Sequence, residues 1–301
     1  MRVLVTGVTG QVGGALVRLA GGKAAEGVEI VGVGRDRLDL AQPGRIDGAL
    51  DAVRPDLVIN PAAYTAVDKA EQEPDLAFTI NRDGPAALAA ACAERRIGLI
   101  HVSTDYVFDG AGTRPYRPED PVSPLGVYGV SKEAGETAIR HALEDHVILR
   151  TAWVYAARGG NFMNTMLRVG KDRDELRVVD DQHGTPTGAV DIASALLALV
   201  RARMDGAPVA AGTYHYTADG ATTWHGFAEA IFDRAEPLWG RRPTVHAIPT
   251  SEYPTPARRP AYSVLDTSAL IGALPTLPHR SWQAALDEVF AARMAAEETV
   301  R

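Results

Sequence analysis

Tyr128 and Lys132 are the side chains in this sequence that are best placed to carry out chemistry. They stand four residues apart, so on a helix they share one face. A phenol has a pKa near ~10, but an adjacent ammonium group favours the phenolate and lowers that pKa. The same ammonium group can hydrogen-bond to the ribose of a nicotinamide cofactor. The pair predicts proton transfer; the alternative is a half-buried tyrosine and a solvated lysine on a surface helix.

A hydroxyl group precedes this pair at the end of an expected strand. Ser103 and Thr104 close the apolar run 99–102, and ligands of open α/β sheets bind at the carboxyl ends of strands. A hydroxyl there can hydrogen-bond to a substrate carbonyl oxygen. We therefore predict Thr104, Tyr128 and Lys132 as the catalytic residues.

The N-terminus contains a glycine motif. An apolar run at 3–5, typical of a buried strand, is followed by Gly7, Gly10 and Gly13. Glycines permit a tight turn, close approach of a diphosphate and close packing of the next helix, expected over 11–20. The free N–H groups of that helix favour an anion. The motif predicts a dinucleotide site; the alternative is a strand–turn–helix with glycines for turning only.

Composition excludes several classes. The chain has 301 residues, of which 46% are hydrophobic and 23% charged, as in ordinary globular proteins, and its net charge of −7 argues against a nucleic-acid partner. Its single cysteine, Cys92, cannot form an intrachain disulfide and is expected to be buried and reduced. No segment resembles a signal peptide or reaches the length of a membrane span. We expect a cytoplasmic protein with no membrane partner.

The elements that must position these residues alternate between strand and helix. Strands are expected at 3–5, 28–33, 57–60, 99–102 and 147–149, and helices at 11–20, 45–53, 82–95 and 127–143. This order predicts an α/β fold with a doubly wound parallel sheet of the Rossmann type. We expect a dinucleotide-binding domain at 1–150. Residues 151–301 are expected to form a smaller C-terminal α/β substrate lobe, interleaved with the last strands of the sheet and ending in a helix at 281–296.

Longer motifs resemble the extended short-chain dehydrogenase/reductase family and, within it, the dTDP-4-dehydrorhamnose reductase family. The most specific is Ser-Thr-Asp-Tyr-Val-Phe-Asp-Gly at 103–110. The resemblance covers most of the chain, to about residue 266, through segments at 7–13, 54–60, 65–71, 123–129, 150–155, 181–187 and 258–260.

The resemblance implies reduction of the 4-keto group of dTDP-4-dehydro-L-rhamnose to dTDP-L-rhamnose, with NADPH or NADH as hydride donor. Thr104 and Tyr128 would hold the carbonyl oxygen, Tyr128 would deliver the proton, and Lys132 would hold the ribose. Besides Tyr128 and Lys132, the predicted cofactor-binding residues are Gly7, Gly10, Gln11, Val12, Gly13, Arg35, Asp39, Leu40, Ala62, Ala63, Tyr64, Thr65 and Val102. Besides Thr104, the predicted substrate-binding residues are Asp105, Tyr106, Trp153, Arg258 and Arg259.

Arginine residues bear on cofactor choice. Arg35 and Arg37 follow the expected second strand and can pair with a 2′-phosphate, which favours NADPH. Asp36 and Asp39 weaken that inference, since an acidic residue there can favour the unphosphorylated ribose.

Arg258 and Arg259 lie in a proline-bounded segment at 256–260. Prolines restrict that backbone, and arginine suits bidentate phosphate contacts, so at least one of the two is a candidate for the substrate diphosphate. The alternative is a solvated basic loop.

Some relatives bind Mg²⁺ at a dimer interface through acidic residues that include one in the first helix. Ala15 stands at that position here, and we expect no metal.

Three function classes stay open. The first is a sugar-nucleotide ketoreductase; the second is an epimerase or a reductase for another 4-keto-6-deoxy sugar; the third is a non-catalytic regulatory subunit. The complete set of Thr104, Tyr128 and Lys132 argues against the third. The expected partner is a small nucleotide-sugar substrate, and the expected state is a monomer or homodimer.

Overall fold

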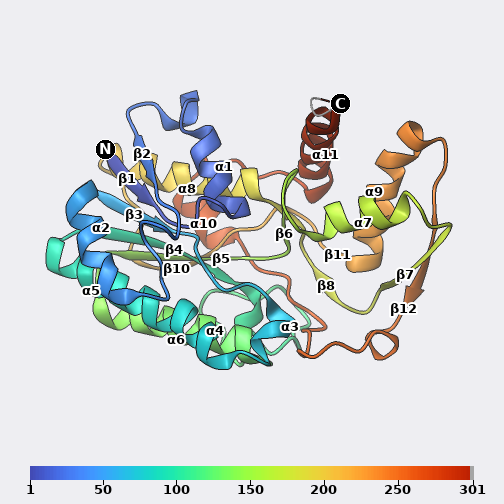
Figure 1. Ribbon diagram of the computed structural model, residues 1–301, viewed down its shortest axis with the longest axis horizontal. Coiled ribbons are helices and arrows are strands. Elements are labelled where there is room, and N and C mark those ends of the chain that lie inside the picture. Colours follow the sequence, from blue (N-terminus) through green and yellow to red (C-terminus); the bar gives the residue numbers. More distant parts are fainter. Residues whose placement is uncertain (299–301) are drawn as a thin grey trace.

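The structure is a computed structural model and describes residues 1–298. Its centre is a six-stranded sheet in which every neighbouring pair of strands is parallel, in the order β10-β5-β4-β3-β1-β2 (Figure 1). The strands are β1 (Arg2–Val5), β2 (Glu29–Gly32), β3 (Leu57–Asn60), β4 (Gly98–Thr104), β5 (His146–Thr151) and β10 (Gly212–His215). The central strand β3 is buried along its whole length, as a sheet covered on both faces requires. The predicted doubly wound parallel sheet is confirmed.

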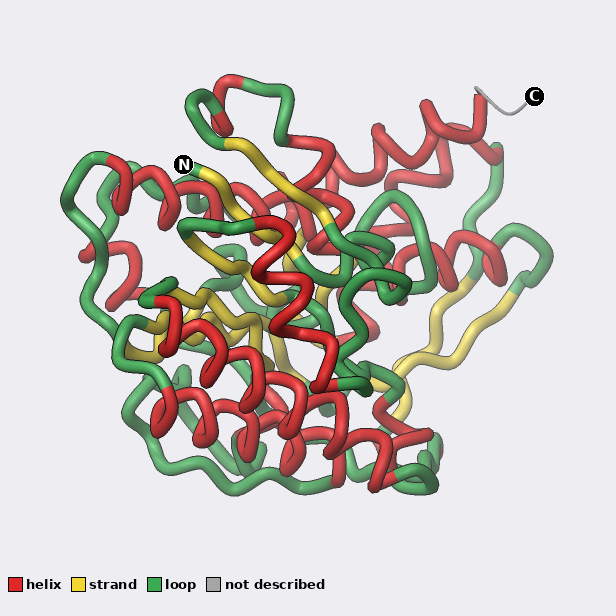
Figure 2. Tube along the Cα trace, turned by 60° about the vertical axis from the view of Figure 1, so that its left-hand side comes forward, coloured by secondary structure: helices red, strands yellow, loops and turns green. Residues whose placement is uncertain are grey.

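Helices cover both faces of the sheet (Figures 1 and 2). On one face, Leu16 and Leu196 join a single buried apolar cluster. On the other face, Leu50 and Leu88 belong to a second cluster. The first group is α1 (Gln11–Leu19), α8 (Ala189–Met204) and α10 (Ser268–Ala273); the second is α2 (Ile46–Val53), α5 (Gly84–Arg95) and α6 (Val127–Ala142). The two apolar clusters hold the sheet rigidly between them, so its carboxyl edge can position a site.

The strand order changes direction beside β1. From β1 the chain crosses to β2 on one side, whereas β3, β4 and β5 follow one another on the other side. In open α/β sheets a ligand crevice forms at such a switch point, outside the carboxyl ends of the strands. The glycine turn after β1 and the end of β4 at Thr104 both lie at this edge.

The helix expected at 82–95 begins later than predicted. After the short helices α3 (Val67–Ala70) and α4 (Pro74–Phe78), residues Thr79–Asp83 form one wide π-helical turn, and α5 starts at Gly84. Pro85 has no backbone N–H and its ring crowds the carbonyl group four residues earlier, so the backbone widens before it.

The chain after Arg150 contributes to two parts of the molecule. It returns to the sheet to supply the helices α8 and α10 and the edge strand β10, which pairs with β5. The rest forms a lobe beside the sheet (Figure 1). Its helices are α7 (Phe162–Gly170), α9 (Trp224–Trp239) and α11 (Trp282–Glu298). Its strand pairs are β6 (Val154–Tyr155) with β9 (Thr187–Gly188), β7 (Glu175–Val179) with β12 (Thr244–Ile248), and β8 (His183–Gly184) with β11 (Thr222–Thr223).

Within residues 1–298, no helix combines the length and the apolar character needed to cross a membrane.

Candidate active site

The glycine turn brings backbone against backbone. Gly7 has a φ of +59°, a conformation that strains most side chains. A Cβ atom at Gly13 would lie 2.5 Å from the Gly7 carbonyl oxygen, so α1 packs against the turn only because that position is glycine. No side chain caps α1 at Gly10. Its first N–H groups are therefore available to an anion, as the sequence predicts.

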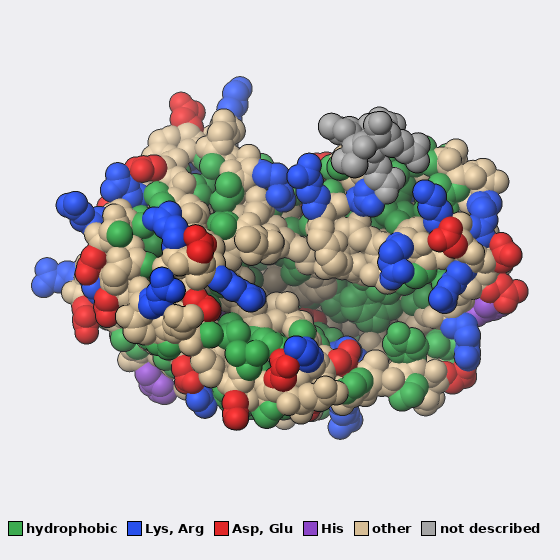
Figure 3. Space-filling view, in the orientation of Figure 1, with side chains coloured by type: hydrophobic (Ala, Val, Ile, Leu, Met, Phe, Trp, Pro, Cys, Tyr) green, Lys and Arg blue, Asp and Glu red, His purple; other side chains and the backbone are tan. Residues whose placement is uncertain are grey.

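A cavity of about 820 Å³ extends from this turn across the sheet edge to the C-terminal lobe. The space-filling view shows the molecule hollowed between its two halves (Figure 3). The cavity is lined by most of the residues predicted from the sequence: Gly7, Gly10, Gln11, Val12, Gly13, Arg35, Asp39, Leu40, Ala62, Ala63, Thr65, Val102, Thr104, Asp105, Tyr106, Tyr128, Lys132 and Trp153. The structure thus brings both predicted motifs into one space.

Three predicted residues do not line this cavity: Tyr64, Arg258 and Arg259. The Tyr64 hydroxyl donates a hydrogen bond to Glu73 at 2.8 Å, and Asn81 binds both backbone groups of Tyr64. Tyr64 therefore braces the loop after β3. Arg258 is exposed, whereas Arg259 is partly buried and forms an ion pair with Asp68 at 2.6 Å.

Tyr128 lies on the first turn of α6 and is buried. Burial raises the pKa of its phenol to about 12; Asp105 acts in the same direction, and the Thr104 hydroxyl acts against it. The expectation that this pKa is lowered is wrong, because desolvation of the phenolate dominates and Lys132 is not among the groups that shift it. Tyr128 is therefore protonated at neutral pH, as a proton donor must be.

Lys132 lies one turn further along α6 and is also buried. Its Nζ donates a hydrogen bond to the Val102 carbonyl oxygen at 2.8 Å and lies 3.1 Å from His101 Nε2. Burial lowers the pKa of Lys132 to about 8, while Glu136 acts in the opposite direction. The ammonium form is held at the cavity edge by acceptors on β4.

Buried polar side chains cluster at the carboxyl ends of β4 and β5. Ser103, Asp105 and Thr151 all line the cavity; Ser103 faces the Glu136 carboxylate and Asp105 faces Ser263, whereas Thr151 Oγ1 has no hydrogen-bond partner. Burial raises the pKa of Asp105 to about 6, although hydrogen bonds to its carboxylate act against this. A buried polar atom left without a partner is costly. Thr151 Oγ1 therefore suits a polar ligand such as a sugar.

Two tryptophan rings form the lobe side of the cavity. Trp153 stacks on Trp224 with 3.5 Å between ring centroids and 4° between planes. Trp153 has a φ of +46°, which is strained for a bulky residue. A Cβ atom at Gly184 would lie 2.4 Å from the Trp153 ring, so glycine is required beneath it. Trp224 and Gly184 therefore fix the Trp153 ring at the cavity. A residue that only filled the core would not need this strained backbone conformation.

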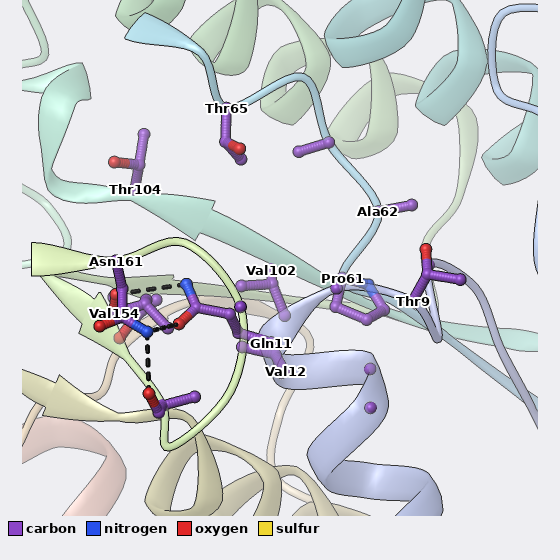
Figure 4. Close-up of a pocket in the computed structure, with 18 of the residues that line it drawn as sticks. Thr9, Gln11, Val12, Pro61, Ala62, Thr65, Val102, Thr104, Val154 and Asn161 are labelled. Atoms are coloured by element: carbon purple, nitrogen blue, oxygen red, sulfur yellow. Dashed lines mark hydrogen bonds between the residues drawn. The ribbon is translucent and has the colours of Figure 1, made fainter. Parts of the chain in front are cut away.

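Gln11 joins the two halves of the molecule beside the cavity (Figure 4). Asn161 Nδ2 donates to Gln11 Oε1 at 3.0 Å and to the Ala156 carbonyl at 2.8 Å. Sequence reasoning missed Asn161, as it missed Arg18 and Trp224, which also line the cavity. Asn161 precedes α7 as an N-cap, a recognisable signal, but its link to α1 depends on the fold.

Among the described residues, no group of three or more His, Cys, Asp or Glu side chains is arranged to hold a metal ion.

A dinucleotide-sized cavity at the switch point of a parallel sheet, with a tyrosine and a lysine on one helix face, defines a nicotinamide-dependent oxidoreductase of the short-chain dehydrogenase/reductase type. The comparisons with known proteins agree. The chain belongs to the RmlD substrate binding domain family, whose model matches residues 1–294.

Curated and solved relatives cover nearly all of the chain. It is 45% identical to a dTDP-4-dehydrorhamnose reductase of Sinorhizobium fredii, over 90% of each chain. A solved dTDP-4-dehydrorhamnose reductase of Clostridium acetobutylicum superposes with a TM-score of 0.88 at 37% identity, covering 97% of this chain and 99% of that one. The enzyme of the same name from Bacillus anthracis, solved with NADP, has a TM-score of 0.88 at 33% identity, with the same coverage.

Proposed function

We propose that this protein reduces the 4-keto group of dTDP-4-dehydro-L-rhamnose to give dTDP-L-rhamnose, with NADPH or NADH as reductant. The observation that carries the proposal is the buried, protonated Tyr128 at the cavity, with the Thr104 hydroxyl beside its phenol and Lys132 one turn further along the same helix. Membership of the family and the names of the relatives supply the substrate.

The residues present fit a nicotinamide dinucleotide. Gly13 lets α1 pack directly against the backbone of the Gly7 turn, and α1 begins at the cavity with uncapped N–H groups. Gly7, Gly10, Gln11, Val12 and Gly13 would hold the diphosphate, while Arg35 and Asp39 lie along the same cavity and would meet the adenosine ribose. When bound, the cofactor supplies the hydride.

The chain's own groups supply the proton and the orientation. The Tyr128 phenol donates its proton to the carbonyl oxygen as that oxygen gains negative charge. The Thr104 hydroxyl, beside the phenol, hydrogen-bonds to the same oxygen. The Lys132 ammonium group stabilises the phenolate that remains, and it has a third N–H available beyond its two contacts on β4. Each group acts more strongly because the site is buried.

The C-terminal segment offers a cation for the substrate diphosphate. Arg259 Nη1 is buried and has no hydrogen-bond partner, while Nη2 of the same side chain pairs with Asp68. Burial raises the pKa of Tyr106, which lines the cavity, and the nearby Arg259 charge acts to lower it. We therefore assign the diphosphate contact to Arg259 and not to the exposed Arg258.

The decisive assay measures NADPH and NADH consumption with a panel of dTDP-linked 4-keto-6-deoxy sugars, with product stereochemistry read by NMR. Turnover of dTDP-4-dehydro-L-rhamnose to the rhamnose product supports the proposal. Turnover of a different 4-keto sugar alone favours a related reductase, and interconversion without net cofactor consumption favours an epimerase. The cytoplasmic location and the monomeric or homodimeric state stay predictions.

A further inference from the structure

A chain of buried polar side chains leads inward from Lys132 across three adjacent strands. Lys132 Nζ lies 3.1 Å from His101 Nε2 on β4, and His101 Nδ1 lies 3.0 Å from Asn60 Nδ2 on β3. The Thr6 hydroxyl, directly after β1, donates a hydrogen bond to Asn60 Oδ1 at 2.5 Å. Thr6, Asn60 and His101 are fully buried, and Lys132 is 1% exposed.

Thr6, Asn60 and His101 each follow a buried apolar residue of their strand, namely Val5, Ile59 and Ile100. Burying such groups costs free energy unless each finds a partner. Thr6, beside the glycine turn, ends the chain of contacts without reaching solvent, so the chain does not offer a proton route to bulk water. It can, however, fix the position of the one member that reaches the cavity, which is Lys132.

Hydrogen-bond logic determines how the histidine must be protonated. An ammonium group has only donors, so His101 Nε2 must accept from it and the proton must sit on Nδ1. His101 Nδ1–H then requires the Asn60 amide oxygen opposite it, so the amide must be turned relative to its placement in the structure, where Nδ2 faces His101 and Oδ1 accepts from Thr6. The oxygen and nitrogen of an amide are exchanged by a simple rotation.

We propose that His101 is a positioning residue for Lys132: a neutral imidazole, protonated on Nδ1 and anchored by Asn60 and Thr6, that accepts a hydrogen bond from the ammonium group and holds it at the cavity. The inference rests on the proposed role of Lys132. Burial and the Lys132 charge both lower the pKa of His101, which keeps the ring neutral. The alternative is a core histidine whose contacts serve stability alone.

Nitrogen NMR of the full-length protein labelled with ¹⁵N-histidine tests the geometry without any assay of activity. The His101 signals are assigned by their loss in His101→Gln. At neutral pH we expect one protonated nitrogen, Nδ1, and an unprotonated Nε2 whose shift changes in Lys132→Met. Protonation of Nε2, on its own or together with Nδ1, overturns the proposal, whatever the enzyme's substrate proves to be.

A double-mutant cycle tests the function. His101→Leu removes the acceptor, and loss of a residue that orients a functional group commonly costs about 10–100-fold, which we expect here in kcat together with weaker NADPH binding. His101→Gln offers an amide oxygen and should recover part of both losses. In a Lys132→Met background, His101→Leu should change neither the NADPH dissociation constant nor the residual kcat appreciably.

Three results overturn the positioning role. Equal losses from His101→Leu with and without Lys132 mean that His101 does not act through the lysine. Equal losses in His101→Leu and His101→Gln, with matching falls in Tm, mean that packing alone is involved. Unchanged kcat and NADPH affinity in a folded His101→Leu protein show that Lys132 needs no such anchor.

Discussion

The Arg259 guanidinium lies 2.6 Å from the Asp68 carboxylate, and this ion pair joins segments 191 residues apart. Asp68 also accepts a hydrogen bond from the Ala257 backbone N–H at 3.2 Å. Two contacts therefore hold residues 257–259 against α3, near Tyr106, which lines the cavity. This contact gives the arginine a defined position that its exposed neighbour Arg258 lacks.

Arg259→Ala should weaken dTDP binding. Charge-assisted hydrogen bonds contribute about 1.5–3 kcal/mol, so we expect a loss on the order of 10–100-fold, measured by calorimetry with dTDP alone. Arg258→Ala is the matched control and should bind dTDP like the parent protein.

Asp68→Asn separates charge from loop position, since it removes the carboxylate charge while an amide oxygen can still accept a hydrogen bond from the Arg259 guanidinium. We expect dTDP affinity to be kept or increased. If Arg259→Ala binds dTDP normally, or if Asp68→Asn loses as much affinity as Arg259→Ala, the assignment of the diphosphate contact to Arg259 is wrong.

Tyr128→Phe should remove most activity and leave cofactor affinity nearly intact. The phenyl ring packs as the phenol does, but the transferable proton is lost, and general acid–base catalysis contributes about 10²–10⁴-fold. Single-turnover NADPH oxidation and a separate NADPH titration measure the two effects. A fully active Phe variant would exclude Tyr128 as the acid.

Lys132→Met should weaken both turnover and cofactor binding, because one ammonium group serves the phenol and the ribose. The comparison is the NADPH dissociation constant of Lys132→Met beside that of Tyr128→Phe, measured without substrate. Equal values in the two variants would show that Lys132 makes no ribose contact.

Activity should fall as pH rises through about 8, the pKa to which burial lowers Lys132. Below that pH the amine is charged and can stabilise the developing phenolate; above it the charge is lost. Tyr128, with a pKa raised to about 12, stays protonated across this range. The pH profile of kcat/KM for the reduction reports the free enzyme's groups. A kcat/KM that stays constant as pH rises above about 8 would contradict the role assigned to the Lys132 ammonium group.

Arg35→Ala should raise the KM for NADPH more than the KM for NADH, since Arg35 lines the cavity and a 2′-phosphate distinguishes the two cofactors. Arg37, which does not line the cavity, supplies the control Arg37→Ala. Arg18 lines the same cavity. The double variant Arg18→Ala/Arg35→Ala should therefore discriminate less between NADPH and NADH than either single variant. Equal effects of Arg35→Ala on both cofactors would mean that Arg35 does not recognise the phosphate.

The sequence by itself determined five of the six strands of the sheet and the helix that carries Tyr128 and Lys132. The buried run Leu57–Asn60 was predicted and is found as β3, and the four-residue spacing of Tyr128 and Lys132 places both on one face of α6. Both are local properties, because strand burial and helix periodicity act over a few residues. The close approach of Gly13 to the Gly7 carbonyl group is local for the same reason, whereas a Cβ atom at Gly7 would meet Ala62, from the loop after β3.

Only the tertiary structure decided the environment of these groups. The pKa of Tyr128 rises although a lysine lies one turn away, because burial depends on every element packed around the phenol. The contacts of Lys132 with His101 and of Arg259 with Asp68 join segments 31 and 191 residues apart. No spacing rule connects such positions. They meet because parallel strands align their carboxyl ends and because the segment at 256–260 folds back over that edge.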